Sequence, residues 1–223
     1  MMGCESALEA VGVSFGYGSQ QPVLRDVSFS VKKGDFAILC GINGAGKSTM
    51  MRLILGEIVP LGGSIRLFSE DIRRFRAWNR VGYLPQRSLV RSSGIPATAE
   101  ELVAGMLYRR GIRGRERKEK ALGALSVVGM GDYSNRLMGN LSVGQQQKVM
   151  IARAIVGDPE ILLLDEPTAG VDIQSIQSIY DLFSQLVTKR GITLLMITHD
   201  TGRELAPASR TFHLENGVIY DQF

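Results

Sequence analysis

The chain has 223 residues, of which 44% are hydrophobic and 22% charged. These values are those of a soluble globular protein with one domain of generous size, long enough to bury a full α/β core. No apolar run approaches the roughly 18 residues that a bilayer crossing needs, so we expect no membrane-spanning helix. The net charge of +4 favours anionic partners, whether nucleotide, lipid head groups or nucleic acid, without choosing among them.

The first residues, Met1 to Ser6, lack a basic segment followed by an apolar one, so we expect no secretory signal and a cytoplasmic protein. The two cysteines, Cys4 and Cys40, form neither a disulfide framework nor a metal-ligand spacing. They suit a reducing compartment as plain thiols.

Short β-like pieces broken by glycines run from Ala7 to about Leu67. Among them, residues 24–31 and 64–68 are predicted strands. This part of the chain is therefore expected to be rich in β structure, apart from one helix that begins near Lys47.

A glycine-rich loop with the pattern GxxxxGK[ST] lies between an apolar run at 36–40 and a helix-like segment at 50–55. Its glycines let several backbone N–H groups point at a polyphosphate, at the positive end of the following helix. In this pattern Lys47 reaches the β- and γ-phosphates, and the Ser48 hydroxyl reaches Mg²⁺. An ordinary glycine turn is the alternative, but it does not explain the placement between strand and helix. The candidate nucleotide-binding residues of the loop are Gly41, Asn43, Gly44, Ala45, Gly46, Lys47, Ser48 and Thr49.

Between residues 87 and 156 the pattern becomes helical, and Thr98 with the acids after it predicts a helix start. We expect a helical subdomain inserted here. Within it, Arg109 to Lys120 contains seven basic residues beside Glu116 and Glu119. A solvated helix face explains this run, and a contact with lipid head groups is the alternative.

Two continuous apolar runs, 161–164 and 193–198, predict strands of a parallel sheet that is buried on both faces, with a helix over about 173–189 between them. The first run ends in Asp165 and Glu166, where such a sheet places its ligands. Buried carboxylates are costly unless they hold a metal or do chemistry. We assign Asp165 to Mg²⁺ and Glu166 to the general base that activates water. A helix cap at the strand end is the alternative.

A third motif, Leu141-Ser142-Val143-Gly144-Gln145, completes a set that resembles the nucleotide-binding subunits of ABC transporters. In that family the sequence LSGGQ touches the γ-phosphate held by the opposite subunit. The resemblance therefore implies that Ser142, Gly144 and Gln145 act in trans. Val143 stands where the family has glycine, and its side chain could crowd the approach of the backbone to phosphate.

The resemblance also implies roles for four single residues, each of which could otherwise have an ordinary structural role. Gln86 matches the glutamine that senses Mg²⁺ or water, although a Gln after Pro otherwise indicates a turn. His199 matches the histidine that contacts the γ-phosphate, although a histidine at a strand end is more often structural. Asp172 matches a carboxylate that works across the dimer interface; otherwise it caps a helix, and both roles can hold together. Tyr17 matches the ring beneath adenine. Phe15 is the alternative ring, and either could be a core aromatic. ATP is the nucleotide that the resemblance implies, with GTP left open.

The resemblance covers nearly the whole chain and implies an α/β fold: a P-loop NTPase (RecA-like) core with an N-terminal antiparallel β subdomain and an inserted α-helical subdomain. We expect one domain, with residues 1–86 and 157–223 forming the core and β subdomain, and 87–156 the helical subdomain. It further implies a second copy, which completes each ATP site, membrane permease subunits, and a position on the inner face of the cell membrane. An extracytoplasmic substrate-binding protein would complete the system.

Residues 95–103 and 169–172 are similar to segments of the ABC branch that serves zinc and manganese uptake. Other importers or exporters remain alternatives, as do ABC-type ATPases that act on nucleic acid or iron–sulfur assembly. The chain shows neither a long coiled coil nor a second cassette, and aromatic residues are scarce in its basic run, so we expect no nucleic-acid partner.

Overall fold

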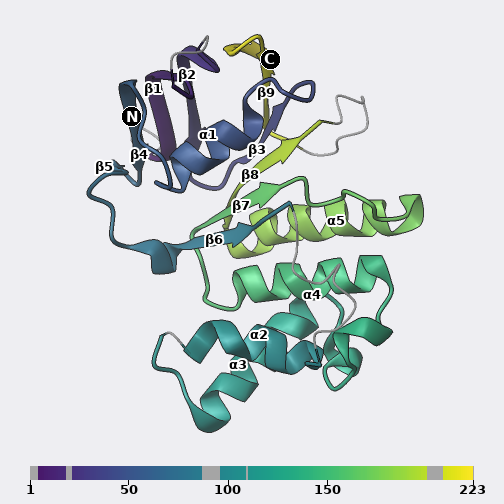
Figure 1. Ribbon diagram of the computed structural model, residues 1–223. Coiled ribbons are helices and arrows are strands. Elements are labelled where there is room, and N and C mark those ends of the chain that lie inside the picture. Colours follow the sequence, from purple (N-terminus) through teal and green to yellow (C-terminus); the bar gives the residue numbers. More distant parts are fainter. Residues whose placement is uncertain (1–4, 19–21, 87–95, 109, 200–207, 223) are drawn as a thin grey trace.

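The computed structural model describes residues 5–18, 22–86, 96–108, 110–199 and 208–222. Two sheets lie at one end of the molecule and a group of helices at the other, with α5 between them (Figure 1). The strands are β1 (Ser6–Phe15), β2 (Leu24–Lys32), β3 (Phe36–Cys40), β4 (Gly62–Leu67), β5 (Glu70–Asp71), β6 (Val81–Leu84), β7 (Ile161–Asp165), β8 (Thr193–Thr198), β9 (Arg210–Glu215) and β10 (Val218–Gln222). The α-helices are α1 (Lys47–Ile54), α2 (Ala99–Tyr108), α3 (Gly114–Val127), α4 (Val143–Ile155) and α5 (Ile173–Arg190).

The larger sheet has the order β10-β9-β3-β8-β7-β6, and all of its strands except β10 run parallel. Alternate residues of its central strands face two different cores. Leu162 and Leu164 on β7 pack with the helical elements, whereas Ile161 and Leu163 pack with α1 and the smaller sheet. This double burial explains why β7 and β8 are unbroken apolar runs, as predicted for a parallel sheet.

The smaller sheet is antiparallel, with the order β2-β1-β4-β5. It confirms the β structure expected near the N-terminus, and its predicted strands at 24–31 and 64–68 differ from β2 and β4 by at most two residues at each end. Strands β5, β6, β9 and β10 were not predicted from the sequence. β6 contains Gly82 and has only four residues, so its period-2 pattern is too short to stand out.

Helices α2, α3 and α4 pack on one another below the sheet (Figure 1). The predicted helix start at Thr98 is confirmed, because Thr98 Oγ1 accepts from the Glu101 backbone N–H while the Glu101 carboxylate accepts from the Thr98 backbone N–H. The later helix predicted over 173–189 is α5, which extends one residue further, to Arg190. None of the helices in the described ranges combines the length and apolar character that a bilayer crossing requires.

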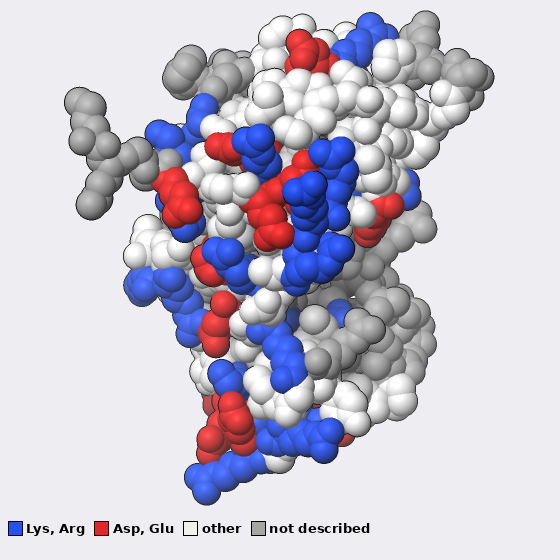
Figure 2. Space-filling view, turned by 90° about the vertical axis from the view of Figure 1, so that its left-hand side faces the viewer, with Lys and Arg blue, Asp and Glu red and all other residues white. Residues whose placement is uncertain are grey.

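The basic run at 109–120 lies mainly on α3, and its first residue falls outside the described residues. Three of its side chains reach carboxylates: Arg115 lies 2.6 Å from Glu119, Lys118 lies 3.7 Å from Glu100, and Lys120 lies 3.7 Å from Asp158. Acidic side chains are interspersed among basic ones over the face seen in Figure 2. This mixture is typical of a solvated helix face.

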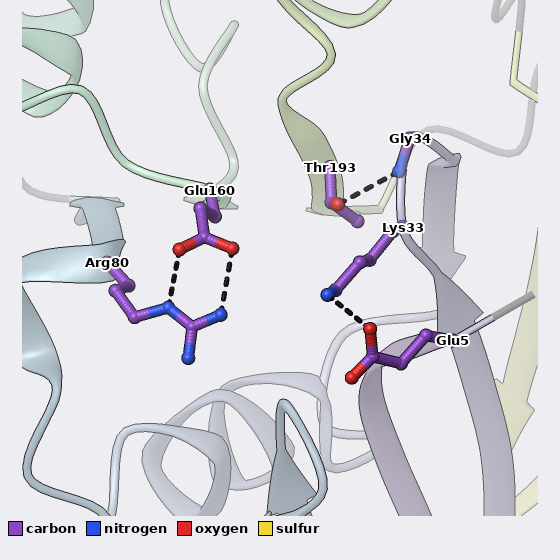
Figure 3. Close-up of polar contacts among 6 residues, drawn as sticks. All are labelled: Glu5, Lys33, Gly34, Arg80, Glu160 and Thr193. Atoms are coloured by element: carbon purple, nitrogen blue, oxygen red, sulfur yellow. Dashed lines mark hydrogen bonds and ion pairs between the residues drawn. The ribbon is translucent and has the colours of Figure 1, made fainter.

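Arg80 joins three parts of the fold at the amino ends of the parallel strands. Its guanidinium donates two hydrogen bonds to Glu160, at 2.5 and 2.8 Å, and so ties the start of β6 to the start of β7 (Figure 3). The same guanidinium stacks 3.7 Å from the ring centroid of Phe68, between β4 and β5. Lys33 bonds Glu5 nearby, and the Gly34 backbone N–H donates to Thr193 Oγ1.

We expect Arg80→Met to lower the free energy of unfolding by about 1–2 kcal/mol, because a bidentate pair and a close cation–π contact are lost together. Urea unfolding of the purified chain measures this change. Arg115→Met is the matched control: its pair with Glu119 is a highly exposed i,i+4 contact, and its loss should cost at most about 0.5 kcal/mol. Equal losses of unfolding free energy in the two variants would contradict a role for Arg80 in joining these parts of the fold.

Cys40 is a free, buried thiol at the end of β3. Its Sγ lies 3.3 Å from His213 Nδ1 on β9, and burial raises the pKa of the thiol. Cys4 lies outside the described residues. The expectation of plain thiols therefore agrees with the one cysteine that the structure describes.

Candidate active site

Four of the predicted motifs follow four neighbouring parallel strands. The glycine-rich loop follows β3, Gln86 comes two residues after β6, Asp165 ends β7 and precedes Glu166, and His199 follows β8. Because these strands run in one direction, their carboxyl ends meet at one edge of the sheet. The topology therefore gathers residues that lie far apart in the sequence.

The glycine-rich loop closes tightly against β9 and β2 before it enters α1. A Cβ atom on Gly41 would lie 2.2 Å from the Leu214 carbonyl oxygen, and one on Gly46 would lie 2.9 Å from Leu24 Cδ2. Gly46 is also the residue before α1, in a left-handed conformation with φ of 106°. The first turn of α1 has neither a side-chain cap nor an acidic residue, so its N–H groups and the helix dipole favour an anion there.

Lys47 is nearly buried at the start of α1, with 6% of its surface exposed. Its ammonium donates to the carbonyl oxygens of Gly41 and Ile42, at 2.7 and 3.0 Å, within its own loop. Burial lowers the pKa of Lys47, and the charges of Glu166 and Asp165 oppose this shift. The lysine is therefore held at the loop, under the influence of both carboxylates.

Asp165 is 7% exposed, and its Oδ1 atom is buried without a hydrogen-bond partner among the described residues. Burial, and next the charge of Glu166, raise the pKa of Asp165 to about 6, against the opposing effect of Lys47. An unpartnered carboxylate oxygen fits a hard cation. Mg²⁺ in nucleotide sites is commonly held by one or two carboxylates together with substrate phosphates, so a larger cluster of protein ligands is not required. Among the described residues, no three His, Cys, Asp or Glu side chains are grouped so that they could hold a metal ion by themselves.

Glu166 binds both Gln86 and His199. Gln86 Nε2 donates to Glu166 Oε2 at 2.7 Å, and His199 Nδ1 lies 3.1 Å from Glu166 Oε1. The backbone of Glu166 has φ of 48°, which turns the chain out of β7, and its N–H donates to the Ile197 carbonyl oxygen. Such a conformation costs on the order of 1–3 kcal/mol in a residue other than glycine and occurs most often at functional sites.

The two candidate aromatic rings differ in exposure. Phe15 is 8% exposed and packs in the core, whereas Tyr17 is 45% exposed. The Phe15 ring meets Tyr17 edge-on, with centroids 5.0 Å apart. The Tyr17 hydroxyl lies 3.4 Å from Thr49 Oγ1 at the phosphate loop. Of the two rings, Tyr17 is therefore the one with exposed surface on which a nucleotide base could stack.

Two helix N-termini carry the remaining candidate residues. Ser142 caps α4: its Oγ accepts from the Gln145 backbone N–H, and Gln145 Oε1 accepts from the Ser142 N–H. Asp172 caps α5 by accepting from the Ser175 N–H at 2.9 Å. Hydrogen bonding to the Ser175 side chain, and next to its backbone N–H, lowers the pKa of Asp172. Val143, the departure from LSGGQ, is 47% exposed.

Gly144 brings these two helix ends together. A Cβ atom at this position would lie 2.6 Å from Ser175 Oγ and 2.7 Å from Ser175 Cβ, closer than real contacts allow. Only a glycine therefore lets the start of α4 rest on the first turn of α5. Ser175 was not predicted as a site residue, because nothing in the sequence signals this contact. Only its spacing three residues after Asp172 indicates a helix cap.

We expect Gly144→Ala to lower the free energy of unfolding by about 1–3 kcal/mol through overpacking against Ser175. In a Ser175→Gly background, the same substitution should cost less than half as much. Urea unfolding of the four chains measures both costs. As a control, Gly123→Ala lies in α3 with nothing within 4 Å of the added Cβ atom, and it should leave stability unchanged or raise it. If Gly144→Ala lowered the free energy of unfolding equally in the wild type and in Ser175→Gly, the close contact between Gly144 and Ser175 would be contradicted.

The structure thus places the candidate residues in two groups. Gln86, Asp165, Glu166 and His199 lie with the glycine-rich loop, and Tyr17 reaches the loop through Thr49. Within the described residues, no hydrogen bond or ion pair joins Ser142, Gln145 or Asp172 to that loop. One chain therefore presents two separate surfaces, a phosphate cradle and a pair of helix N-termini.

A family model described as ABC transporter matches residues 24–169 of the chain. The chain belongs to the ABC transporter family. It is the ATP-binding and ATP-hydrolysing subunit of an ABC transport system. The assignment agrees with the order of motifs, from the phosphate loop to Glu166, that the sequence analysis used.

Named relatives cover most of this ABC ATPase. It is 40% identical to the zinc uptake system ATP-binding protein ZurA of Listeria innocua, over 96% of this chain and 84% of that protein. It is 34% identical to the high-affinity zinc uptake system ATP-binding protein ZnuC of Bacillus subtilis, over 92% and 89%. It is 39% identical to the manganese transport system ATP-binding protein MntB of Bacillus subtilis, over 81% and 72%.

Solved structures of ATP-binding cassettes share the fold. One is cbiO1 of Clostridium perfringens, part of the transporter complex cbiONQ, with a TM-score of 0.87 and 25% identity over 97% of this chain and 87% of that one. Another is the dimeric ATP-binding cassette MJ0796 in a post-hydrolysis state with ADP and phosphate, with a TM-score of 0.79 and 27% identity over 96% and 97%. The P-loop NTPase fold predicted from the sequence is confirmed, and ATP binding is a property of this family.

Proposed function

We propose that two copies of this ABC ATPase enclose two Mg²⁺-ATP molecules and hydrolyse them to drive the uptake of zinc or manganese through separate membrane subunits. The observation that carries the hydrolytic site is the contact of Glu166 with Gln86 and His199, beside Asp165 and Lys47. The metal substrate rests on the names of relatives such as ZurA, ZnuC and MntB.

In this proposal the cradle binds the triphosphate through the backbone N–H groups of residues 41–49, and Lys47 neutralises the β- and γ-phosphates. Asp165, Ser48 and Gln86 would hold Mg²⁺, which, when bound, neutralises charge that develops on the transferred phosphoryl group. The unpartnered Oδ1 atom of Asp165 supports this assignment.

Glu166 acts as the general base, and its two neighbours orient it. A carboxylate offers about four lone-pair positions, so its bonds to Gln86 and His199 leave room to accept a proton from water. The proton then resides on Glu166 while the γ-phosphoryl group passes to the water oxygen, its bond to the β,γ-bridging oxygen breaks, and ADP leaves. His199 would also contact the γ-phosphate, and Gln86, which comes two residues after β6, would connect the base with the segment that follows this strand.

Ser142, Gly144, Gln145 and Asp172 would complete the site of the second copy. Two helix N-termini held together by the Gly144–Ser175 contact form a platform with positive potential, which suits the γ-phosphate of a partner. Dimeric cassettes among the similar structures support this arrangement. A lone copy would then lack part of each site and hydrolyse ATP slowly.

A groove of about 330 Å³ beside the edge strand β6 is the proposed docking surface for the permease. Strand β6, Pro85, α2 and α4 form it, and none of its described lining residues is acidic. Arg110 lies on its wall, and Arg153, whose pKa is lowered by burial, lies half-buried in it. An apolar helix with a carboxylate fits such a groove. Because Pro85 precedes Gln86, docking there would sense the state of the ATP site, with the subunit on the inner face of the membrane and a substrate-binding protein outside.

Measuring the uptake of metal by cells tests whether zinc or manganese is the transported substrate. In a strain that lacks this gene, radioactive zinc or manganese should enter the cell when the wild-type chain is restored and not when Lys47→Ala is supplied at equal abundance. Uptake of both metals at the same rate with either chain would overturn the metal assignment. Restored uptake of a different solute would then identify another ABC importer, and a salt-sensitive nucleic-acid complex would indicate the non-transport class.

A further inference from the structure

The Tyr17 ring is fixed at three points, although nearly half of its surface is exposed. Phe15 meets it edge-on at an interplanar angle of 85°. Its hydroxyl lies 3.4 Å from Thr49 Oγ1, a buried atom two residues after the phosphate-loop lysine. The same hydroxyl accepts a hydrogen bond of 3.0 Å from Arg52 Nη1. A tyrosine that only filled the core would not need its polar end tied to the nucleotide loop.

Arg52 is itself held in place from its other side. It lies in the last turn of α1, and its Nε lies 3.3 Å from Glu57 Oε2, just beyond that helix. Both carboxylate and guanidinium are about half exposed, so this pair adds little stability of its own. What the pair does is limit the directions in which the guanidinium can point. The three side chains form the line Glu57, Arg52, Tyr17.

We propose that Arg52 is a positioning residue for the nucleotide base, acting through the Tyr17 hydroxyl. This rests on the proposed function, in which Tyr17 is the ring beneath adenine. A tyrosine free to rotate loses side-chain entropy when a base stacks on it, and a ring already fixed does not. Arg52 therefore raises the affinity for the base while leaving the phosphate contacts unchanged.

A purely structural role for Arg52 gives a different expectation. As a basic residue in the last turn of α1, it also interacts favourably with the helix dipole. If that were its whole role, its loss would weaken α1 and the phosphate loop together. Binding of a ligand without a base separates these two cases.

The experiment measures binding by calorimetry to the full chain, for ATP and for inorganic tripolyphosphate. Arg52→Met, Tyr17→Phe and the double variant are compared with the wild type. Loss of one such hydrogen bond should weaken ATP binding about three- to tenfold. Tripolyphosphate binding should stay unchanged. Because Tyr17→Phe already removes the hydroxyl that Arg52 binds, the double variant should bind ATP no more weakly than Tyr17→Phe alone. Arg52→Lys, which keeps a donor, should recover part of the affinity.

Three results would overturn the proposal: unchanged ATP affinity in Arg52→Met, equal losses for ATP and tripolyphosphate, or additive losses in the double variant. Arg66→Met, on β4, where the arginine lies 3.9 Å from Glu9, is the control for loss of an exposed arginine and should bind both ligands normally. Tyr17→Ala separates the two levels of the argument. If it binds ATP with full affinity, the base platform itself is wrong; if it binds ATP weakly and Arg52→Met does not, only the role of Arg52 fails.

Discussion

Replacing Glu166 with glutamine should lower the steady-state rate of ATP hydrolysis by about 10²- to 10⁴-fold, the range associated with removal of a general base. Glutamine keeps the size of the side chain and can still bond Gln86, but it cannot take a proton from water. The geometry around β7 and β8 should therefore persist. ATP affinity should remain close to that of the wild type, because the phosphate loop is untouched.

Phosphate release, measured at saturating Mg²⁺-ATP, checks this expectation. Glu119→Gln is the matched control, since this glutamate is exposed on α3 and forms an exposed ion pair with Arg115. It should hydrolyse ATP at the wild-type rate. If Glu166→Gln also did so, Glu166 could not be the base, and its contacts with Gln86 and His199 would need another explanation.

Asp165→Asn should have two effects of opposite sign. Without nucleotide and Mg²⁺, at pH 7.5, it should raise the free energy of unfolding by about 1–3 kcal/mol, because it removes a buried carboxylate whose pKa is raised to about 6. Hydrolysis of Mg²⁺-ATP should fall by about 10²-fold or more, since a metal-binding carboxylate is lost. Functional residues often lower the free energy of unfolding while they support activity, and we expect Asp165 to do both.

The pH dependence of this stability difference follows from the sign of the shift. Asp165 has a pKa of about 6 in the folded chain, above its ordinary value of 3.8. Between these values the folded chain binds more protons than the unfolded chain, so the wild type loses stability as the pH rises from about 4 to about 6. Asparagine does not titrate. The advantage of the variant should therefore shrink as the pH is lowered from 7.5 to 4, as urea unfolding at several pH values would show. A constant difference, or a variant less stable at pH 7.5, would contradict the buried charge.

Motifs and strands could be read from the sequence where the local pattern and the tertiary environment agree. The glycine-rich loop has a fixed spacing, and β7 and β8 are apolar on both faces, so each was recognisable without knowledge of its neighbours. The position of His199 directly after the predicted strand at 193–198 was also correct, whereas the strand before Gln86 was not predicted.

The features that could not be predicted from the sequence depend on contacts between residues far apart in the chain. The Arg52–Tyr17 bond spans 35 residues, and the Gly144–Ser175 contact joins the ends of two helices. β6 is short, and β9 and β10 alternate too briefly to distinguish from loops. The unpartnered oxygen of Asp165 is likewise a property of the folded environment. Sequence patterns identify which residues carry chemistry, whereas packing decides how each is held.

If two copies of the chain share their ATP sites, the Glu166→Gln variant should form a stable dimer around ATP, which its mass in solution would reveal. By light scattering at saturating Mg²⁺-ATP, the mass should be twice the 24.4 kDa of one chain, and it should return to 24.4 kDa without nucleotide. Adding Ser142→Arg, which blocks the helix N-terminus offered to the partner, should keep the particle at 24.4 kDa even with ATP. A variant that binds ATP yet stays at the mass of one chain, while the wild type hydrolyses at its full rate as a single copy, would contradict the account.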